Sequence, residues 1–231
     1  MTARWKGLAA ILTAAFVSLW PAAGAAQPVF FDDFDGDELL PHWVTPDPSE
    51  WKFSVSDSQL HVEDLFRPSV PKLSANNASI GAFFEPQMDF RMDVWMGWER
   101  EPAPRWDELV VEVHVGSAIM AQFGLAAPGA PPAIVAAAGA GGIFAPPPPP
   151  GIHQFTIART GSVFDFYLDG DHFGSLPDMF GFPADAVVFF FSKPFPGEMN
   201  PKHIDRIRIV PAPGALIVAA VCVIACARRR R

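Results

Sequence analysis

Two stretches of the chain alternate between apolar and polar residues with a period of two. Over residues 88–96, Met, Phe and Val alternate with Asp, Arg and Trp. Over residues 108–115, Leu and Val at odd numbers alternate with Glu, Val and His at even numbers. Neighbouring side chains of a β-strand point to opposite faces. The alternation therefore predicts two strands that each have one buried and one exposed face.

Short runs rich in β-branched and aromatic residues predict further strands. They lie at residues 51–56, 60–63, 80–84, 119–123, 155–159, 164–168, 187–192 and 204–209. Ser56-Asp57-Ser58 and Asp169-Gly170 are turn signals, and the second is typical of a hairpin. No helical period appears between Gln27 and Val210. We expect one all-β domain at residues 27–209, folded as a two-sheet antiparallel sandwich.

The segment at residues 124–151 interrupts this pattern. It consists almost wholly of Ala, Gly and Pro, and it ends in five consecutive prolines at residues 146–150. A polyproline run is extended and lacks the N–H groups of a sheet ladder. We therefore predict an exposed loop over the whole segment.

The N-terminus has the composition of a secretory signal peptide. Arg4 and Lys6 precede an apolar run at residues 8–19, and small residues follow at residues 22–26. A basic region, an apolar region of this length and small residues are the three parts of a cleavable signal. The run is shorter than the roughly 20 apolar residues that span a bilayer. We predict a signal peptide at residues 1–26 and export of the chain.

The C-terminus has an uncharged apolar stretch between two prolines and four arginines. A helix at residues 214–227 would rise about 21 Å, against a hydrocarbon core of about 30 Å, so it would span only with snorkelling side chains or a thinned bilayer. The terminal arginines favour the cytoplasmic side. We predict a single C-terminal transmembrane helix that anchors the exported domain at least transiently.

This tail resembles the PEP-CTERM sorting signal of bacterial exopolysaccharide-associated proteins. The resemblance covers residues 210–231 and implies an exosortase, a membrane processing enzyme, as a partner. Ala212 stands where that family has glutamate. A plain membrane anchor is the alternative. The residues that carry the resemblance are Val210, Pro211, Ala212, Pro213, Arg228, Arg229, Arg230 and Arg231.

Charge and cysteine content limit what the middle of the chain binds. All 25 acidic residues lie between Asp32 and Asp205, whereas six of the 17 basic residues lie in the two end segments. The middle therefore carries 11 basic against 25 acidic residues, a net charge of −14. Such a surface repels phosphate backbones, which excludes a nucleic-acid partner. The only cysteines, Cys222 and Cys226, lie in the tail, so the domain has no disulfide.

Three short motifs in the domain resemble the concanavalin A-like lectin/glucanase (laminin-G-like) family. The resemblance implies a jelly-roll sandwich and a preference for glycans. The motifs are the opening at residues 31–37 with Leu40 and Trp43, the hairpin at residues 155–159 and 163–170, and the closing strand at residues 203–209.

The family's glucanases carry two glutamates on one strand, with an aspartate between them. Glu108 and Glu112 are the nearest candidates, but Val110 takes the place of the aspartate. Four strand residues separate the two glutamates by about 13 Å. A retaining pair of carboxyl groups needs about 5–5.5 Å and an inverting pair about 6.5–9.5 Å. We expect a solvated strand face here rather than a catalytic site, and an enzyme is the less favoured reading.

Candidate ligand-binding residues are aromatic and acidic. Trp95, Trp98 and Trp106 lie on or near the polar face of one predicted strand, where they would stack on sugar rings. Asp33, Asp35 and Asp37 offer oxygen ligands for calcium, although the spacing lacks the glycine and distal glutamate of an EF-hand. The six histidines lack the paired spacing of a zinc site. We expect no cofactor, with calcium as the alternative.

Together these features predict an exported protein that ends at the cell surface or outside the cell. The preferred function is non-enzymatic: binding or organising extracellular polysaccharide. A glycoside hydrolase-like enzyme on the same fold and a structural surface protein with no small ligand are the two alternatives.

Overall fold

A computed structural model describes residues 27–45, 51–64, 77–102, 107–126, 131–192 and 200–212. The predicted signal peptide, the apolar stretch and the terminal arginines lie outside these ranges, as do Pro213 and Trp106. Within these ranges, the structure contains no helix that is long and apolar enough to cross a membrane.

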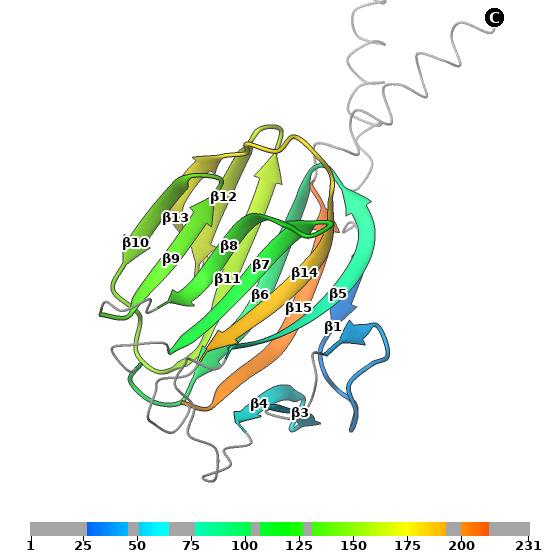
Figure 1. The fold of residues 1–231 in the computed structure, drawn as a ribbon, viewed down its shortest axis with the longest axis vertical. Helices are drawn as coiled ribbons and strands as arrows, with labels where there is room; N and C mark the ends of the chain where they lie inside the picture. Colours follow the sequence, from blue (N-terminus) through cyan, green and yellow to red (C-terminus); the bar gives the residue numbers. More distant parts are fainter. Residues whose placement is uncertain are drawn as a thin grey trace, which may run out of the picture.

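The described residues form two antiparallel β-sheets that face each other (Figure 1). Sheet A has the order β13 (Asp171–Pro177), β12 (Val163–Leu168), β11 (Gly151–Thr160), β6 (Phe90–Trp98), β15 (Lys202–Pro211), β4 (Gln59–Asp64) and β3 (Trp51–Ser56), and β1 (Phe30–Asp32) pairs with β15. Sheet B has the order β10 (Gly141–Ala145), β9 (Ala133–Ala138), β8 (Ala118–Ala126), β7 (Glu108–Val115), β14 (Ala184–Ser192), β5 (Asn77–Gln87) and β2 (Trp43–Val44). The prediction of an all-β, two-sheet sandwich is confirmed.

The core lies between the sheets and follows the predicted alternation. On β6, Phe90, Met92, Val94 and Met96 are buried, and on β7 the odd-numbered residues at 109–113 are buried. Met88, which the alternation also assigned to the buried face, precedes β6 and is 49% exposed. Burial of each large apolar side chain contributes about 1.5–3 kcal/mol, so these strands supply much of the driving force for folding.

Both predicted turns have the backbone conformation that their residues favour. Asp57 and Ser58 have φ of 53° and 56°, and Asp169 and Gly170 have φ of 52° and 87°. Two successive residues with positive φ make a type I′ turn, whose twist matches that of the flanking strands. The turns join β3 to β4 and β12 to β13.

The loop predicted at residues 124–151 is wrong for most of its described residues. Strand β8 continues to Ala126, and β9 and β10 form a hairpin at the edge of sheet B. Ile134, Ala136 and Ala138 are buried in the core. Alanine and glycine have low strand propensity, but the backbone ladder and this buried alternate face are sufficient to hold the strands. The proline run lies outside the strands, as its missing N–H groups require.

The predicted end of the domain at residue 209 is wrong by two residues. Strand β15 pairs with β6 through Val210 and Pro211. Ala212 is buried, and its N–H donates to the Asp89 carbonyl at 3.1 Å. The first three residues assigned to the sorting signal therefore belong to the sandwich or to its last backbone contact.

A buried carboxylate fixes the start of the domain. Asp32, on β1 in sheet A, accepts hydrogen bonds from the Phe34 N–H at 2.8 Å and from the Trp43 indole N–H at 2.7 Å. Trp43 is on β2 in sheet B. The opening motif that resembled lectin/glucanase domains thus connects the two sheets.

Candidate functional site

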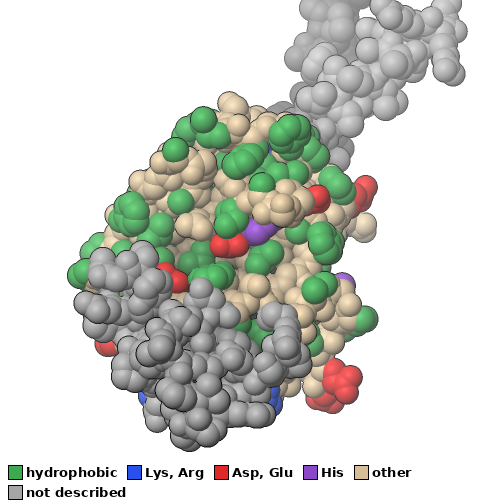
Figure 2. All heavy atoms as spheres, viewed as in Figure 1, with side chains coloured by type: hydrophobic (Ala, Val, Ile, Leu, Met, Phe, Trp, Pro, Cys, Tyr) green, Lys and Arg blue, Asp and Glu red, His purple; other side chains and the backbone are tan. Residues whose placement is uncertain are grey.

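The outer face of sheet B is hollowed by a groove of about 640 Å³. Figure 2 shows this face, with red carboxylates and a purple histidine in its middle among green and tan atoms. We call this hollow the sheet B groove. It is lined by Glu108, Val110, Glu112, Gln122, Ala126, Val135, Ala137, Gly139, Ala140, Gly141, Gly142, Phe144 and Phe190.

Small side chains make the floor of the groove. Most of them come from β8, β9 and the turn into β10, in the segment that the sequence reading assigned to a loop. Strands β7 and β8 also approach closely: a Cβ atom at Gly124 would lie 2.2 Å from the Leu109 carbonyl oxygen. A glycine is therefore required at this position, and the Ala/Gly composition of the segment keeps the groove open.

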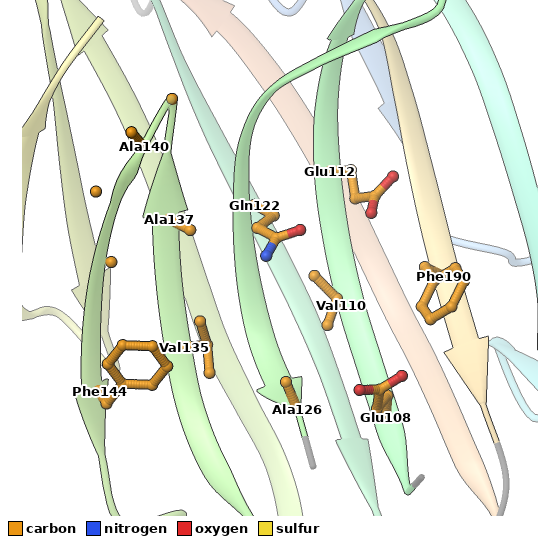
Figure 3. Close-up of a pocket in the computed structure, with 13 residues that line it drawn as sticks. Glu108, Val110, Glu112, Gln122, Ala126, Val135, Ala137, Ala140, Phe144 and Phe190 are labelled. Carbon is orange, nitrogen blue, oxygen red and sulfur yellow. The ribbon is translucent and has the colours of Figure 1, made fainter. Parts of the chain in front are cut away.

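Glu108, Val110 and Glu112 all project from β7 into the groove (Figure 3), as the period of two requires. Both glutamates are only 9% exposed, so they are less solvated than an ordinary strand face. The Glu112 carboxylate lies 2.8 Å from Nε2 of His114, the next outward residue of the same strand. This contact orients Glu112 along the strand axis.

Glu108 contacts its register partner on β14, next to a buried ion pair. Its Oε2 accepts a hydrogen bond from the Ser192 hydroxyl at 2.8 Å. The Lys202 amine donates to the Ser192 carbonyl at 2.9 Å and lies 2.8 Å from the Asp107 carboxylate. Lys202 and Asp107 are fully buried. Burial lowers the pKa of Lys202, while the Asp107 and Glu108 carboxylates oppose this shift.

The arrangement suits binding of hydroxyl groups better than bond cleavage. Val110 separates the two glutamates, and each carboxylate already has a partner at 2.8 Å. A regular strand keeps their Cα atoms about 13 Å apart, so the carboxyl groups reach the separation of a hydrolytic pair only if both side chains turn toward each other. Instead, Glu108 contacts Ser192 and Glu112 contacts His114. The remaining carboxylate lone pairs and the Gln122 amide supply hydrogen-bonding groups for a polyhydroxylated ligand.

A second hollow of about 290 Å³ continues the same face toward β5 and β2. His114, whose ring contacts Glu112, lines this hollow, as do Val188 and Phe83. Phe83 is 67% exposed. The outer face of sheet B is therefore recessed on both sides of Glu112, as an extended ligand would require.

Trp95 and Trp98, two of the three tryptophans predicted to bind ligand, do not line the sheet B groove. Trp95 lies on the outer face of sheet A, where the Arg206 guanidinium stacks 4.2 Å from the ring centroid. Trp98 is 1% exposed and Trp106 is outside the described residues. The aromatic rings in the groove are Phe144 and Phe190. Phe190 was missed because it stands within three consecutive phenylalanines at residues 189–191, where only alternation tells the outward ring from its buried neighbours.

The acidic residues proposed for calcium lie at the start of the domain, away from the groove. Asp35 and Asp37 are exposed and Asp33 is half-buried. Across the part of the chain that the structure describes, no group of three or more His, Cys, Asp or Glu side chains is placed to hold a metal ion. Calcium binding stays a prediction.

Comparison with known proteins gives the fold and no family. No protein-family model matches the chain, and no curated protein matches it. A sialidase superposes with a TM-score of 0.62 at 13% identity, over 81% of this chain; the chain spans only 19% of that protein.

Two smaller proteins match over nearly their whole length. The CBM2 module of the evolved Dit of Lactobacillus casei BL23 phage J-1 gives a TM-score of 0.60 at 13% identity, over 80% of this chain and 95% of the module. A β-1,3-glucanase from Mycobacterium marinum gives 0.59 at 12% identity, over 80% of this chain and 100% of that protein. The structural neighbours have concanavalin A-like folds of the glycoside hydrolase and lectin type, and this chain shares their jelly-roll sandwich.

Proposed function

We propose that this protein binds an extended polysaccharide along the outer face of sheet B without cleaving it. The observation that carries the proposal is the sheet B groove itself, where Glu108, Glu112 and Gln122 lie among small residues on a recessed face. Sugar hydroxyls would donate to the two carboxylates, and the rings of Phe144 and Phe190 would contact the apolar faces of sugars. The names of the solved neighbours, a β-1,3-glucanase and a sialidase among them, support a glycan as the ligand.

We further propose that the domain acts outside the cell, where such polymers occur. The support is in the sequence: the basic, apolar and small-residue order of residues 1–26, and the tail at residues 210–231 that resembles an exosortase substrate. The mass of the mature protein in cells tests this. Loss of both ends supports export and processing, whereas an intact C-terminus in the membrane fraction favours a plain anchor.

Glycoside hydrolysis is the second candidate, and one observation favours it. Glu108 and Glu112 share one groove at the spacing of a Glu-x-Asp-x-Glu motif, although Val110 replaces the aspartate. If the chain releases sugars from a glycan and Glu112→Gln abolishes that release, the binding-only proposal is overturned in favour of an enzyme.

The direct test is a glycan panel with the purified full-length chain, read out by affinity and by product analysis. The panel includes a β-1,3-glucan, a mucin-type O-glycan and a sialylated glycan. We expect binding to at least one polymer with no hydrolysis products. Glu112→Gln and Phe190→Ala should each weaken that binding about tenfold or more, which corresponds to about 1.4 kcal/mol.

Matched variants outside the groove control for general effects. Glu38 is an exposed acidic residue before β2, and Phe182 is a 60% exposed ring between β13 and β14. Glu38→Gln and Phe182→Ala should leave the affinity unchanged. Equal losses in both sets would place the ligand elsewhere, and no binding to any polymer would favour a structural protein with no small ligand.

A further inference from the structure

Two histidines face each other across neighbouring strands on the outer face of sheet A. His61 on β4 and His203 on β15 are register partners. Their Nδ1 atoms lie 2.9 Å apart, and their rings meet at 81° with centroids 4.8 Å apart. The sequence separates them by 142 residues, so their spacing along the chain gave no indication of the pair.

The second nitrogen of each ring already contacts an acceptor. Nε2 of His61 lies 3.0 Å from the Ser56 carbonyl oxygen, and Nε2 of His203 lies 3.0 Å from the Glu99 carboxylate. Neither acceptor carries a proton to donate, so each Nε2 carries the ring hydrogen.

The two Nδ1 atoms therefore present lone pairs to each other. A neutral imidazole that is protonated at Nε2 has only an acceptor at Nδ1. Two acceptors at 2.9 Å repel unless a cation lies between them. The cation is either one extra proton, shared by the rings, or a metal ion.

We propose that His61 and His203 bind a divalent transition-metal ion of the copper(II) or nickel(II) class through their Nδ1 atoms. Two nitrogens bonded to one ion at about 2.0–2.1 Å lie about 2.9 Å apart at a right angle and about 3.3 Å apart at the tetrahedral angle. The separation in the structure is 2.9 Å. It matches adjacent positions of a square-planar or tetragonal ion, which copper(II) and nickel(II) prefer, better than the tetrahedral geometry of zinc.

The surroundings of the pair fit this role. Glu99 and the Ser56 carbonyl hold the outer nitrogens, as hydrogen-bonded partners of metal-binding histidines do. His203 also lines an open hollow of about 240 Å³, together with Gln59 and Glu99. Water would complete the coordination of an ion that has only two protein ligands.

The metal would join the β3–β4 hairpin to the rest of sheet A. Strand β4 pairs with β15 over only three residue pairs, and His61–His203 is the middle pair. A bound ion adds a cross-strand link at that point. The sheet B groove is on the other sheet, so this inference is independent of the proposed polysaccharide binding.

The test is a titration of the untagged full-length chain with Cu²⁺, followed by calorimetry and electron paramagnetic resonance. We expect a site whose spectrum shows nitrogen ligands and which is lost in His61→Ala and His203→Ala. Glu99→Gln should weaken binding about 10–100-fold, the usual effect of removing an outer-shell partner. Cu²⁺ should raise the melting temperature of the wild type but not that of His203→Ala.

His172→Ala is the matched control, because His172 is an exposed histidine on β13 of the same sheet. All variants keep Cys222 and Cys226, so any thiolate binding is common to every sample. Unchanged copper binding in His61→Ala and His203→Ala overturns the proposal. A proton between the two rings that Cu²⁺ does not displace, seen in the imidazole NMR signals, also overturns it.

Discussion

Charged side chains on the two outer faces of the sandwich differ in the partners that they contact. On sheet A, Arg91 pairs with Asp93 at 2.8 Å and Arg206 stacks on a tryptophan ring, so these three charges have partners on the face itself. On sheet B, neither hollow is lined by a Lys or Arg among the described residues, and Glu108 and Glu112 use neutral or histidine partners. Charged groups that already have oppositely charged or aromatic partners leave few hydrogen-bonding groups for a ligand. On the outer face of sheet B, the Glu108 and Glu112 carboxylates keep acceptor sites that a ligand can use.

The largest expected change in stability comes from the buried ion pair that links the two sheets. Lys202 comes from sheet A but contacts Asp107 and the Ser192 carbonyl, next to Glu108 at the end of the sheet B groove. Lys202→Met should cost about 3–5 kcal/mol in the free energy of unfolding, because it leaves Asp107 buried without its cation. Denaturant unfolding of the full-length chain measures this.

Two variants qualify that result. Lys202→Met with Asp107→Leu should recover part of the loss, since it removes both charges. Lys52→Met, at an exposed position on β3, should change the stability by less than about 0.5 kcal/mol. If Lys202→Met cost no more than Lys52→Met, the buried pair would not support the groove.

A smaller effect is expected from Asp93 on the outer face of sheet A. Its carboxylate accepts hydrogen bonds from Arg91, from the Gln154 amide at 3.1 Å and from the Thr156 hydroxyl at 2.6 Å. Asp93→Ala leaves the fully buried Thr156 hydroxyl without this acceptor and should cost about 1–3 kcal/mol by thermal or denaturant unfolding.

Glu112→Ala should show the opposite profile. It removes one contact to His114 and should lower stability by about 1 kcal/mol or less, but it should weaken glycan binding. Asp93→Ala should leave glycan binding unchanged. If both variants lost glycan binding equally, the outer face of sheet B would not differ from that of sheet A as a binding surface.

The groove can also be filled without changing any charge. Ala137 on β9 lines the groove, whereas Ala158 on β11 is half-buried on the outer face of sheet A. Ala137→Phe should weaken polysaccharide binding by about tenfold, or about 1.4 kcal/mol, because the ring occupies the floor. Ala158→Phe adds the same side chain to the other face and should leave affinity within about twofold. Equal affinities for the two variants would exclude the groove as the binding surface.

The sequence was informative where burial alternates along one strand. The pattern at residues 88–96 and 108–115 predicted the buried faces of β6 and β7, and it also placed Glu108 and Glu112 on one side. The hairpin β9–β10 was missed because alanine fills both its buried and its groove-facing positions, so no change in hydropathy marks the alternation. The same small alanine side chains that obscured the strands in the sequence also leave the groove open.

Contacts across the sheets were beyond reach of the sequence. Lys202 and Asp107 are 95 positions apart, and they meet only because β15 and β7 begin at the same end of the sandwich. Likewise, Trp95 alternated correctly onto a polar face, but only the fold shows that this face belongs to the sheet opposite the groove. Periodicity predicts which side chains of a strand share one face, but it does not predict which strands or residues lie beside that face.

The smallest expected effect tests whether the outer face of sheet A takes any part in binding. Arg206→Ala removes the cation–π contact with Trp95 and should cost about 0.5–1 kcal/mol in stability. Arg208→Ala, at the next outward position of β15, changes the charge equally and should cost less, because no ring contact is lost with it. Equal costs would mean that the stacking contributes nothing. Removal of Arg206 also uncovers the Trp95 ring. A gain of glycan affinity in Arg206→Ala, but not in Arg208→Ala, would show that the Arg206 contact with Trp95 keeps the outer face of sheet A from binding sugars.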